Sequence, residues 1–160
     1  MTESLAYEVP VVPTTACVQL ADRPWVTTPR GNLMRLLRVS ADAGTWVVHN
    51  RFAPGTVTRT HRHTGLVHAF TLRGRWAYLE YDFVAEAGSY VHEMAGATHT
   101  LVVPEDNVEE TEVVFVVEGA NLYLGDDGRV VGYQDGHQIL ADYVRYCAEQ
   151  GHPYPAGVVG

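Results

Sequence analysis

Residues 55–74 read GTVTRTHRHTGLVHAFTLRG, and three of the eight histidines of the chain fall within these twenty residues. His61 and His63 are two residues apart, so in a β-strand their side chains project from the same face. His68 begins the next apolar run, after a break at residues 64–65 that is short enough to fold it back beside the pair. Two imidazoles on one face, with a third close by, are donors suited to a first-row metal ion.

The sequence around this stretch is strand-like. From residue 33 to 132 short runs rich in Val, Tyr, Trp, Phe and Thr are separated by Gly, Pro and Asp turns. A spacing of roughly ten residues per strand and turn predicts an antiparallel sandwich or barrel, that is, an all-β domain. We expect strands at Leu33–Val39, Thr45–Phe52, Val67–Leu72, Arg75–Tyr81, Thr100–Val103, Val113–Val117 and Asn121–Leu124.

The two ends of the chain have different patterns. Residues 1–24 mix prolines with short apolar runs, which predicts an extended N-terminal arm. Over residues 137–150 apolar side chains repeat at intervals of three and four, which predicts an amphipathic C-terminal helix. Asp135 with Gln138 can form the capping box of this helix, and Gly151 can end it.

The composition fits one domain spanning residues 1–160, because 46% of the residues are apolar and 19% are charged. The formal net charge of −8 argues against nucleic-acid binding. No apolar run approaches the ~20 residues that cross a bilayer, and residues 1–4 lack the features of a signal peptide, so we expect no membrane partner and a cytoplasmic location. The two cysteines, Cys17 and Cys147, predict neither a disulfide framework nor a cysteine zinc site.

A second segment, GSYVHEMAGATH at residues 88–99, again joins a strand, a glycine-containing turn and a histidine. The two segments together resemble the paired motifs of the cupin superfamily, which implies a jelly-roll β-barrel. Seven positions match those motifs: Gly55, His61, His63, Gly74, Gly88, Gly96 and His99. Three positions depart from them: His68 replaces the usual Glu, Met94 the usual Pro and Val103 the usual Asn.

The resemblance implies a set of metal ligands. These are His61, His63 and His99, with His68 as the fourth. Imidazole donors suit Fe(II), which we expect, and equally Zn, Ni, Co or Cu. Four neutral histidines would leave the full charge of the ion uncompensated, which favours anionic or chelating oxygen substrates.

A finer resemblance indicates an activity. The run LVHAFTLRGRWAYLEYD at 66–82, with GSY at 88–90 and HTLVV at 99–103, is similar to the 2,4'-dihydroxyacetophenone dioxygenase family, a group similar to acetylacetone dioxygenase. The resemblance implies a mononuclear non-haem Fe(II) dioxygenase that cleaves a carbon–carbon bond of an α-hydroxyketone or β-diketone with O₂. Its substrates would be a small aromatic or aliphatic ketone and O₂.

Two other functions stay open at this point. One is a non-catalytic zinc-binding sensor, similar to the zinc-binding cupin domain of some anti-sigma factors. The other is a metal-dependent isomerase or lyase, which needs no O₂.

Further side chains are candidates for the site. Glu80 and Glu93 are carboxylates that can orient a ligand imidazole or take a substrate proton, the alternative being a solvated strand face. His92 neighbours Glu93 in one strand, so only one of the two can point inward. The expected substrate pocket is formed by Trp76, Tyr78 and Arg75, although core packing is the more common role for a residue such as Trp76.

The remaining histidines and the oligomeric state complete the expectations. His49, His137 and His152 have no partner at a ligand spacing, so we interpret them as surface residues. Small barrels expose sheet edges that partner strands or arms usually cap. We therefore expect a homodimer whose edges are covered by the N-terminal arm and the C-terminal helix.

Overall fold

The computed structural model describes residues 15–40 and 42–159, and almost all of its regular structure is β-strand. The strands are β1 Val26–Thr27, β2 Leu33–Ser40, β3 Thr45–Phe52, β4 His61–His63, β5 Val67–Arg73, β6 Arg75–Tyr78, β7 Ala85–Glu86, β8 Tyr90–Glu93, β9 Thr98–His99, β10 Leu101–Val102, β11 Thr111–Glu118, β12 Asn121–Leu124 and β13 Val130–Gln134. A short 3₁₀ helix, η1 Leu20–Asp22, precedes them, and the α-helix α1 Gly136–Glu149 follows.

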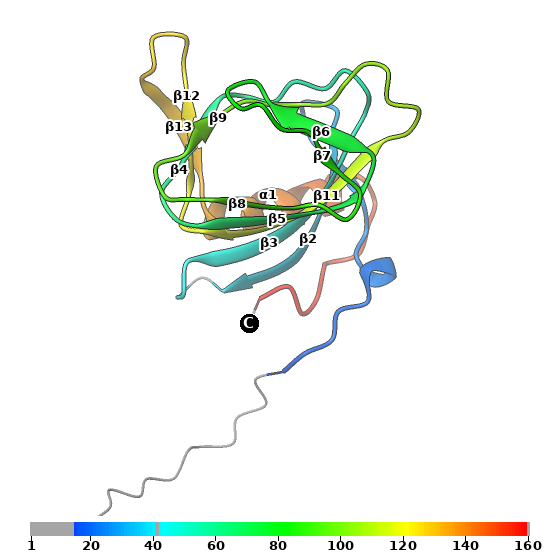
Figure 1. Cartoon of the computed structure of the whole chain (residues 1–160). Helices are drawn as coiled ribbons and strands as arrows, with labels where there is room; N and C mark the ends of the chain where they lie inside the picture. Colours follow the sequence, from blue (N-terminus) through cyan, green and yellow to red (C-terminus); the bar gives the residue numbers. More distant parts are fainter. Residues whose placement is uncertain (1–14, 41, 160) are drawn as a thin grey trace, which may run out of the picture.

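The strands form three sheets that surround a common interior (Figure 1). The largest sheet has six strands in the order β1-β2-β3-β11-β5-β8. A three-stranded sheet, β10-β6-β7, and a four-stranded sheet, β13-β12-β4-β9, complete the ring. Neighbouring strands in these sheets run antiparallel, as expected. The three sheets are not joined into one closed barrel, which refines the predicted architecture without changing the fold class.

The predicted strands agree closely with the observed ones where turn residues flank them. β3 and β12 have the predicted bounds. β6 ends at Tyr78 rather than at Tyr81, because the chain turns over residues 79–82. β11 is longer than expected, since it pairs with both β3 and β5 and so gains hydrogen bonds on both edges.

The C-terminal helix is confirmed within one residue at each end. The side chain of Asp135 accepts a hydrogen bond from the backbone N–H of Gln138, which satisfies one of the free donors at the helix start. Gly151 follows the helix with a φ of 75°, a backbone conformation that glycine adopts without a steric cost. Of the predicted N-terminal arm, residues 1–14 lie outside the described part of the chain.

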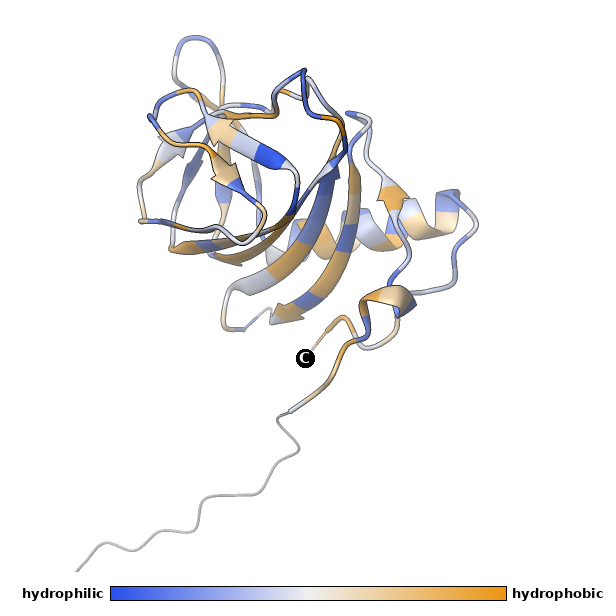
Figure 2. Ribbon diagram, turned by 45° about the vertical axis from the view of Figure 1, so that its right-hand side comes forward, coloured by the Kyte–Doolittle hydropathy of each residue, from blue (hydrophilic) through white to orange (hydrophobic). Residues whose placement is uncertain are grey.

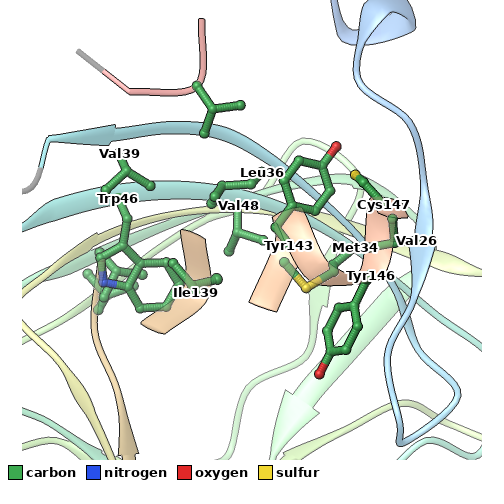
Figure 3. Close-up of a cluster of buried hydrophobic side chains, with 13 residues drawn as sticks. Val26, Met34, Leu36, Val39, Trp46, Val48, Ile139, Tyr143, Tyr146 and Cys147 are labelled. Carbon is green, nitrogen blue, oxygen red and sulfur yellow. The ribbon is translucent and has the colours of Figure 1, made fainter. Parts of the chain in front are cut away.

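Two apolar clusters form the core. One lies between α1 and the strands β1 to β3, and Figure 3 shows Trp46 and Ile139 within it, beside Tyr143 and Met34. The other fills the interior of the ring next to β6, β10 and β11. The turns of α1 carry both hydrophobic and hydrophilic residues, as expected of a helix with one buried face (Figure 2). Among the described residues, no helix is long and apolar enough to cross a membrane.

Candidate metal centre

Three histidines meet at the inner side of the four-stranded sheet. His61 and His63 lie on β4, and His99 lies on β9 directly opposite His61. Their ring centres are 4.8, 4.9 and 4.9 Å apart, which makes a nearly equilateral triangle. One ring nitrogen from each histidine lies within 4.8 Å of the others. In the described part of the chain, these three side chains are therefore placed to hold one metal ion.

A tight turn brings His99 to this position. The backbone N–H of Gly96 donates to the carbonyl of His63, and the N–H of His63 donates to the carbonyl of Ala97. Gly96 has a φ of 89°, a conformation that side chains other than hydrogen disfavour. The turn therefore clamps the end of β4 against the start of β9, and the glycine of the second motif has a clear physical role.

Glu93 and Tyr78 support the histidines from β8 and β6. Glu93 is buried, and its Oε2 lies 2.7 Å from Nε2 of His63 and 3.4 Å from Nε2 of His99. The hydroxyl of Tyr78 donates to Oε1 of Glu93 over 2.5 Å, and its ring stacks on His99 with centres 3.7 Å apart. The Tyr78 ring and the Glu93 carboxylate thus restrain His99 on two sides.

Burial and charge set the protonation states here. Burial lowers the pKa of His61 to about 4, so this imidazole is neutral at physiological pH and its lone pair is free to bind a metal. Burial opposes ionisation of Glu93, but the polar contacts of its carboxylate with the imidazoles of His63 and His99 hold its pKa below the ordinary value. Burial and then the Glu93 charge raise the pKa of Tyr78, which keeps its hydroxyl a proton donor.

These residues fit a first-row metal ion. Around such an ion, imidazole nitrogens bond at about 2.0–2.1 Å and therefore lie about 3–4 Å apart, compatible with the observed cluster. Oε2 of Glu93 is buried and accepts no hydrogen bond of good geometry, despite its short distance to His63. A buried carboxylate oxygen without a well-formed hydrogen bond, beside the ring nitrogens of His63 and His99, is what a cation would complete.

The structure corrects the prediction of His68 as a fourth ligand. In β5, Val67 pairs with Glu93 and shares its buried face, so His68 points the other way. Nδ1 of His68 hydrogen-bonds the hydroxyl of Tyr90, on the outer surface of the sheet. His92 lies opposite His68 on this same outer face. Of the neighbours His92 and Glu93, it is therefore Glu93 that points inward. The carboxylate nearest the histidines therefore comes from β8.

Three other predicted site residues also lie elsewhere. Glu80 is exposed in the turn after β6, where it accepts a hydrogen bond from the backbone N–H of Thr100. Trp76 is fully buried in the core, with its indole N–H bonded to Thr71, so it packs rather than lining a pocket. Arg75 binds Asp106 and Asn107 at the surface. Tyr78 is the one predicted pocket residue that lines the cavity described next.

Two of the three histidines, His61 and His63, open onto a cavity of about 370 Å³ in the interior of the ring. His61, His63 and Tyr78 line one part of it. Apolar side chains from β2, β3, β5, β10 and β11 form part of the wall, and α1 contributes Ile139 and Tyr146. A volume of this size accommodates a small organic molecule next to the metal ligands.

Sequence reasoning missed the polar residues of this cavity. Arg59, Asn121 and Tyr123 line it, the last two from β12, which pairs with β4. Arg59 also orients the candidate metal ligand His61, because the backbone carbonyl of Arg59 lies 2.9 Å from Nδ1 of that imidazole. The alternation 59, 61, 63 was a usable signal, since residues two apart in an extended chain share a face.

His49 was predicted to lie at the surface, but it is buried in a second polar cluster on the other face of β3. Its Nε2 lies 3.0 Å from Oε2 of Glu112, and its Nδ1 accepts a hydrogen bond from Arg35. The ring of Trp25 packs edge-on against His49, between the guanidinium groups of Arg35 and Arg51. This cluster ties the segment before β1 to the outer side of the sheet.

Comparison with known proteins identifies the family. Residues 13–121 match the ChrR cupin-like domain. The chain belongs to this family. An RmlC-like cupin protein from Ralstonia eutropha JMP134 is 27% identical, with a TM-score of 0.81 over 88% of this chain and 91% of its own. A protein of unknown function with a cupin-like fold, from the same organism, is 30% identical, with a TM-score of 0.81 over 95% and 96% of the two chains.

More distant relatives share the cupin fold. An acetylacetone dioxygenase from Acinetobacter johnsonii is 17% identical, with a TM-score of 0.73 over 89% of this chain and 99% of its own. No curated protein matches the sequence. The predicted cupin fold is therefore confirmed, while the resemblance to dihydroxyacetophenone dioxygenases is not resolved beyond the superfamily.

Proposed function

We propose that this cupin is a mononuclear non-haem Fe(II) dioxygenase that cleaves a carbon–carbon bond of an α-hydroxyketone or β-diketone with O₂. The observation that carries the proposal is the triangle of His61, His63 and His99, two of which, His61 and His63, line a ligand-sized cavity. The fold shared with an acetylacetone dioxygenase supports it. Sites for Zn, Ni, Co or Cu use the same donors, so the choice of iron belongs to the proposal.

The side chains of the site have separable roles in such a reaction. His61, His63 and His99 would hold the ion, and an Fe(II) ion bound there supplies Lewis-acid and O₂ redox chemistry. Tyr78 fixes the plane of His99 by stacking on it. The apolar cavity wall excludes water from the bound ketone.

Glu93 is the group that can handle a proton. Its lowered pKa keeps Oε2 ionised, and that oxygen accepts no well-formed hydrogen bond. A carbon next to a carbonyl group is acidic enough for a positioned carboxylate to deprotonate it. As the ionised carboxylate beside His63 and His99, Glu93 would take this proton at Oε2 while Oε1 stays bonded to Tyr78.

The test combines metal content with oxygen consumption. Protein purified without a histidine tag is stripped with a chelator, loaded anaerobically with Fe(II), and mixed with 2,4'-dihydroxyacetophenone or acetylacetone in an oxygen electrode. We expect O₂ uptake that depends on both iron and ketone. No uptake with any ketone of such a panel, in protein that holds iron, would refute the dioxygenase.

Variants test the ligand assignment separately. His61→Ala leaves two imidazoles and is expected to lose the metal, because too few donors remain for a first-row ion. His68→Ala is the matched control, since His68 lies on the outer face of β5, and its metal content is expected to equal that of the wild type. Equal metal content in the His61 variant would contradict the site.

A second candidate function is a non-catalytic zinc-binding regulator, which the match to the ChrR cupin-like domain favours. The solved complex of Rhodobacter sphaeroides SigE with the anti-sigma ChrR shares the fold at a TM-score of 0.53, over 62% of this chain and 52% of that one. Tightly held zinc with no turnover of any ketone would favour this function. Turnover of a ketone without O₂ consumption would instead favour an isomerase or lyase.

A further inference from the structure

The cavity wall carries two kinds of ligand-binding group, the histidines His61 and His63 and the arginines Arg30 and Arg59. We propose that its ligand is a small ketone that carries a carboxylate remote from the carbonyl end, and that Arg59 and Arg30 bind this carboxylate. The ketone part of this ligand rests on the proposed function. Binding of the carboxylate is argued from the cavity alone, and its affinity can be measured without turnover.

The two arginines differ from most others in the chain. The sequence has 11 basic residues, all of them arginine. Five arginines form ion pairs with carboxylates: Arg51, Arg73, Arg75, Arg129 and Arg145. Arg30 and Arg59 both line the cavity, and within the described part of the chain neither has a carboxylate partner. An anion in the cavity would therefore meet guanidinium groups that are free to bind it.

The acidic group of the cavity does not cancel this charge. Asp142 of α1 is the only carboxylate among the described lining residues. Its Oδ1 lies 2.6 Å from a guanidinium nitrogen of Arg145, a residue outside the cavity lining. The charge of Asp142 is thus already paired, and Arg30 and Arg59 leave the cavity wall positive although the whole chain carries a net charge of −8.

Arg59 and His61 both approach the ring of Tyr123. The guanidinium carbon of Arg59 lies 5.0 Å from the centre of the Tyr123 ring, and the imidazole of His61 lies 6.5 Å from it on centres. The hydroxyl of Tyr123 donates to Gln134, which holds the ring in place. Burial raises the pKa of this hydroxyl, whereas the charges of Arg59 and Arg30 lower it, as expected when both guanidinium groups are near.

This stacking prepares Arg59 for a carboxylate. A guanidinium group that lies over an aromatic ring keeps its N–H edge free, and that edge matches the two oxygens of a carboxylate. Other parts of the wall are apolar, with Trp46, Val48, Phe52 and Phe115. The cavity thus offers imidazoles for carbonyl oxygens, guanidinium groups for an anion and apolar surface for the carbon chain of one small ligand.

Binding of 4,6-dioxoheptanoate and of its methyl ester tests the proposal. The two share a β-diketone and differ in charge at the remote end. Titration calorimetry with Zn(II)-loaded protein measures affinity without O₂ chemistry. We expect the acid to bind about tenfold more tightly than the ester at low ionic strength, and the preference to shrink as salt screens the arginines.

Two variants and a control localise the effect. Arg59→Gln and Arg30→Gln are each expected to cut the preference for the acid to about threefold or less, and both side chains are exposed, so folding is retained. Arg62→Gln is the matched control, because Arg62 is exposed on β4 and outside the cavity lining, and it keeps the full preference.

The outcomes separate this proposal from the dioxygenase. Equal affinity for acid and ester, no binding of the acid, or a preference that survives in both arginine variants would overturn carboxylate recognition. A preference for the acid that depends on these arginines, in a protein that consumes no O₂, would support carboxylate recognition and refute the dioxygenase activity.

Discussion

Replacing Tyr78 by Phe removes one hydroxyl from the buried support of the three histidines. The ring stays, so its stacking on His99 at 3.7 Å is kept. The hydrogen bond to Oε1 of Glu93, 2.5 Å long, is lost, and the carboxylate is left buried with one donor fewer. Hydrogen bonds to charged groups contribute about 1.5–3 kcal/mol, so we expect the free energy of unfolding to fall by about 2 kcal/mol.

The measurement is denaturant unfolding of the metal-free protein, because a bound metal would add its own stabilisation. For a chain of this length, about 2 kcal/mol corresponds to a melting temperature lower by about 4–8 °C. Tyr81→Phe is the control, since Tyr81 is 49% exposed and its loss of a hydroxyl is expected to change stability by less than about 0.5 kcal/mol. An unfolding free energy of Tyr78→Phe within that margin of the wild type would show that the hydroxyl does not support Glu93.

Three further predictions concern the proton, the second polar cluster and the assembly. Glu93→Gln is expected to retain bound metal but to lower turnover at least tenfold, because the amide cannot take the substrate proton; full turnover at normal metal content would exclude this role. Burial, followed by the charge of Arg35, lowers the pKa of His49, so the unfolded chain takes up more protons than the folded chain as the pH falls below about 6.5. Stability should therefore drop between pH 6.5 and 5, and His49→Gln should flatten that drop in melting curves, whereas exposed His137→Gln should not. Finally, we predict a homodimer, for which light scattering should give twice the chain mass of 17.7 kDa; a monomer at micromolar concentration would contradict it.

The residues that were predicted correctly are those whose placement depends on local geometry. His61 and His63 share a face because they are two apart in a strand, and the turn at Gly96 carries His99 to them. The C-terminal helix has its cap and stop within a few residues of its ends. Such features need only the chain immediately around them.

His68 could not be placed in the same way, because β5 is apolar on both faces. Val67 and Ala69 are buried, yet Phe70 and Leu72 on the other face are also large and apolar while 45% and 50% exposed. Hydrophobic alternation therefore does not reveal which face is inside, and an error of one residue reverses every side chain. The pairing of Val67 with Glu93 settles the register, and that contact joins separate strands.

The division of the cavity wall between sheets and helix has an evolutionary consequence. The three histidines come from β4 and β9, whereas Ile139, Asp142 and Tyr146 come from α1 at the end of the chain. Substitutions on one face of this helix can reshape the space for a ligand without moving a metal donor. Relatives that keep the histidine spacing are therefore free to diverge in substrate through the helix alone, while a change of metal chemistry requires new residues on the strands.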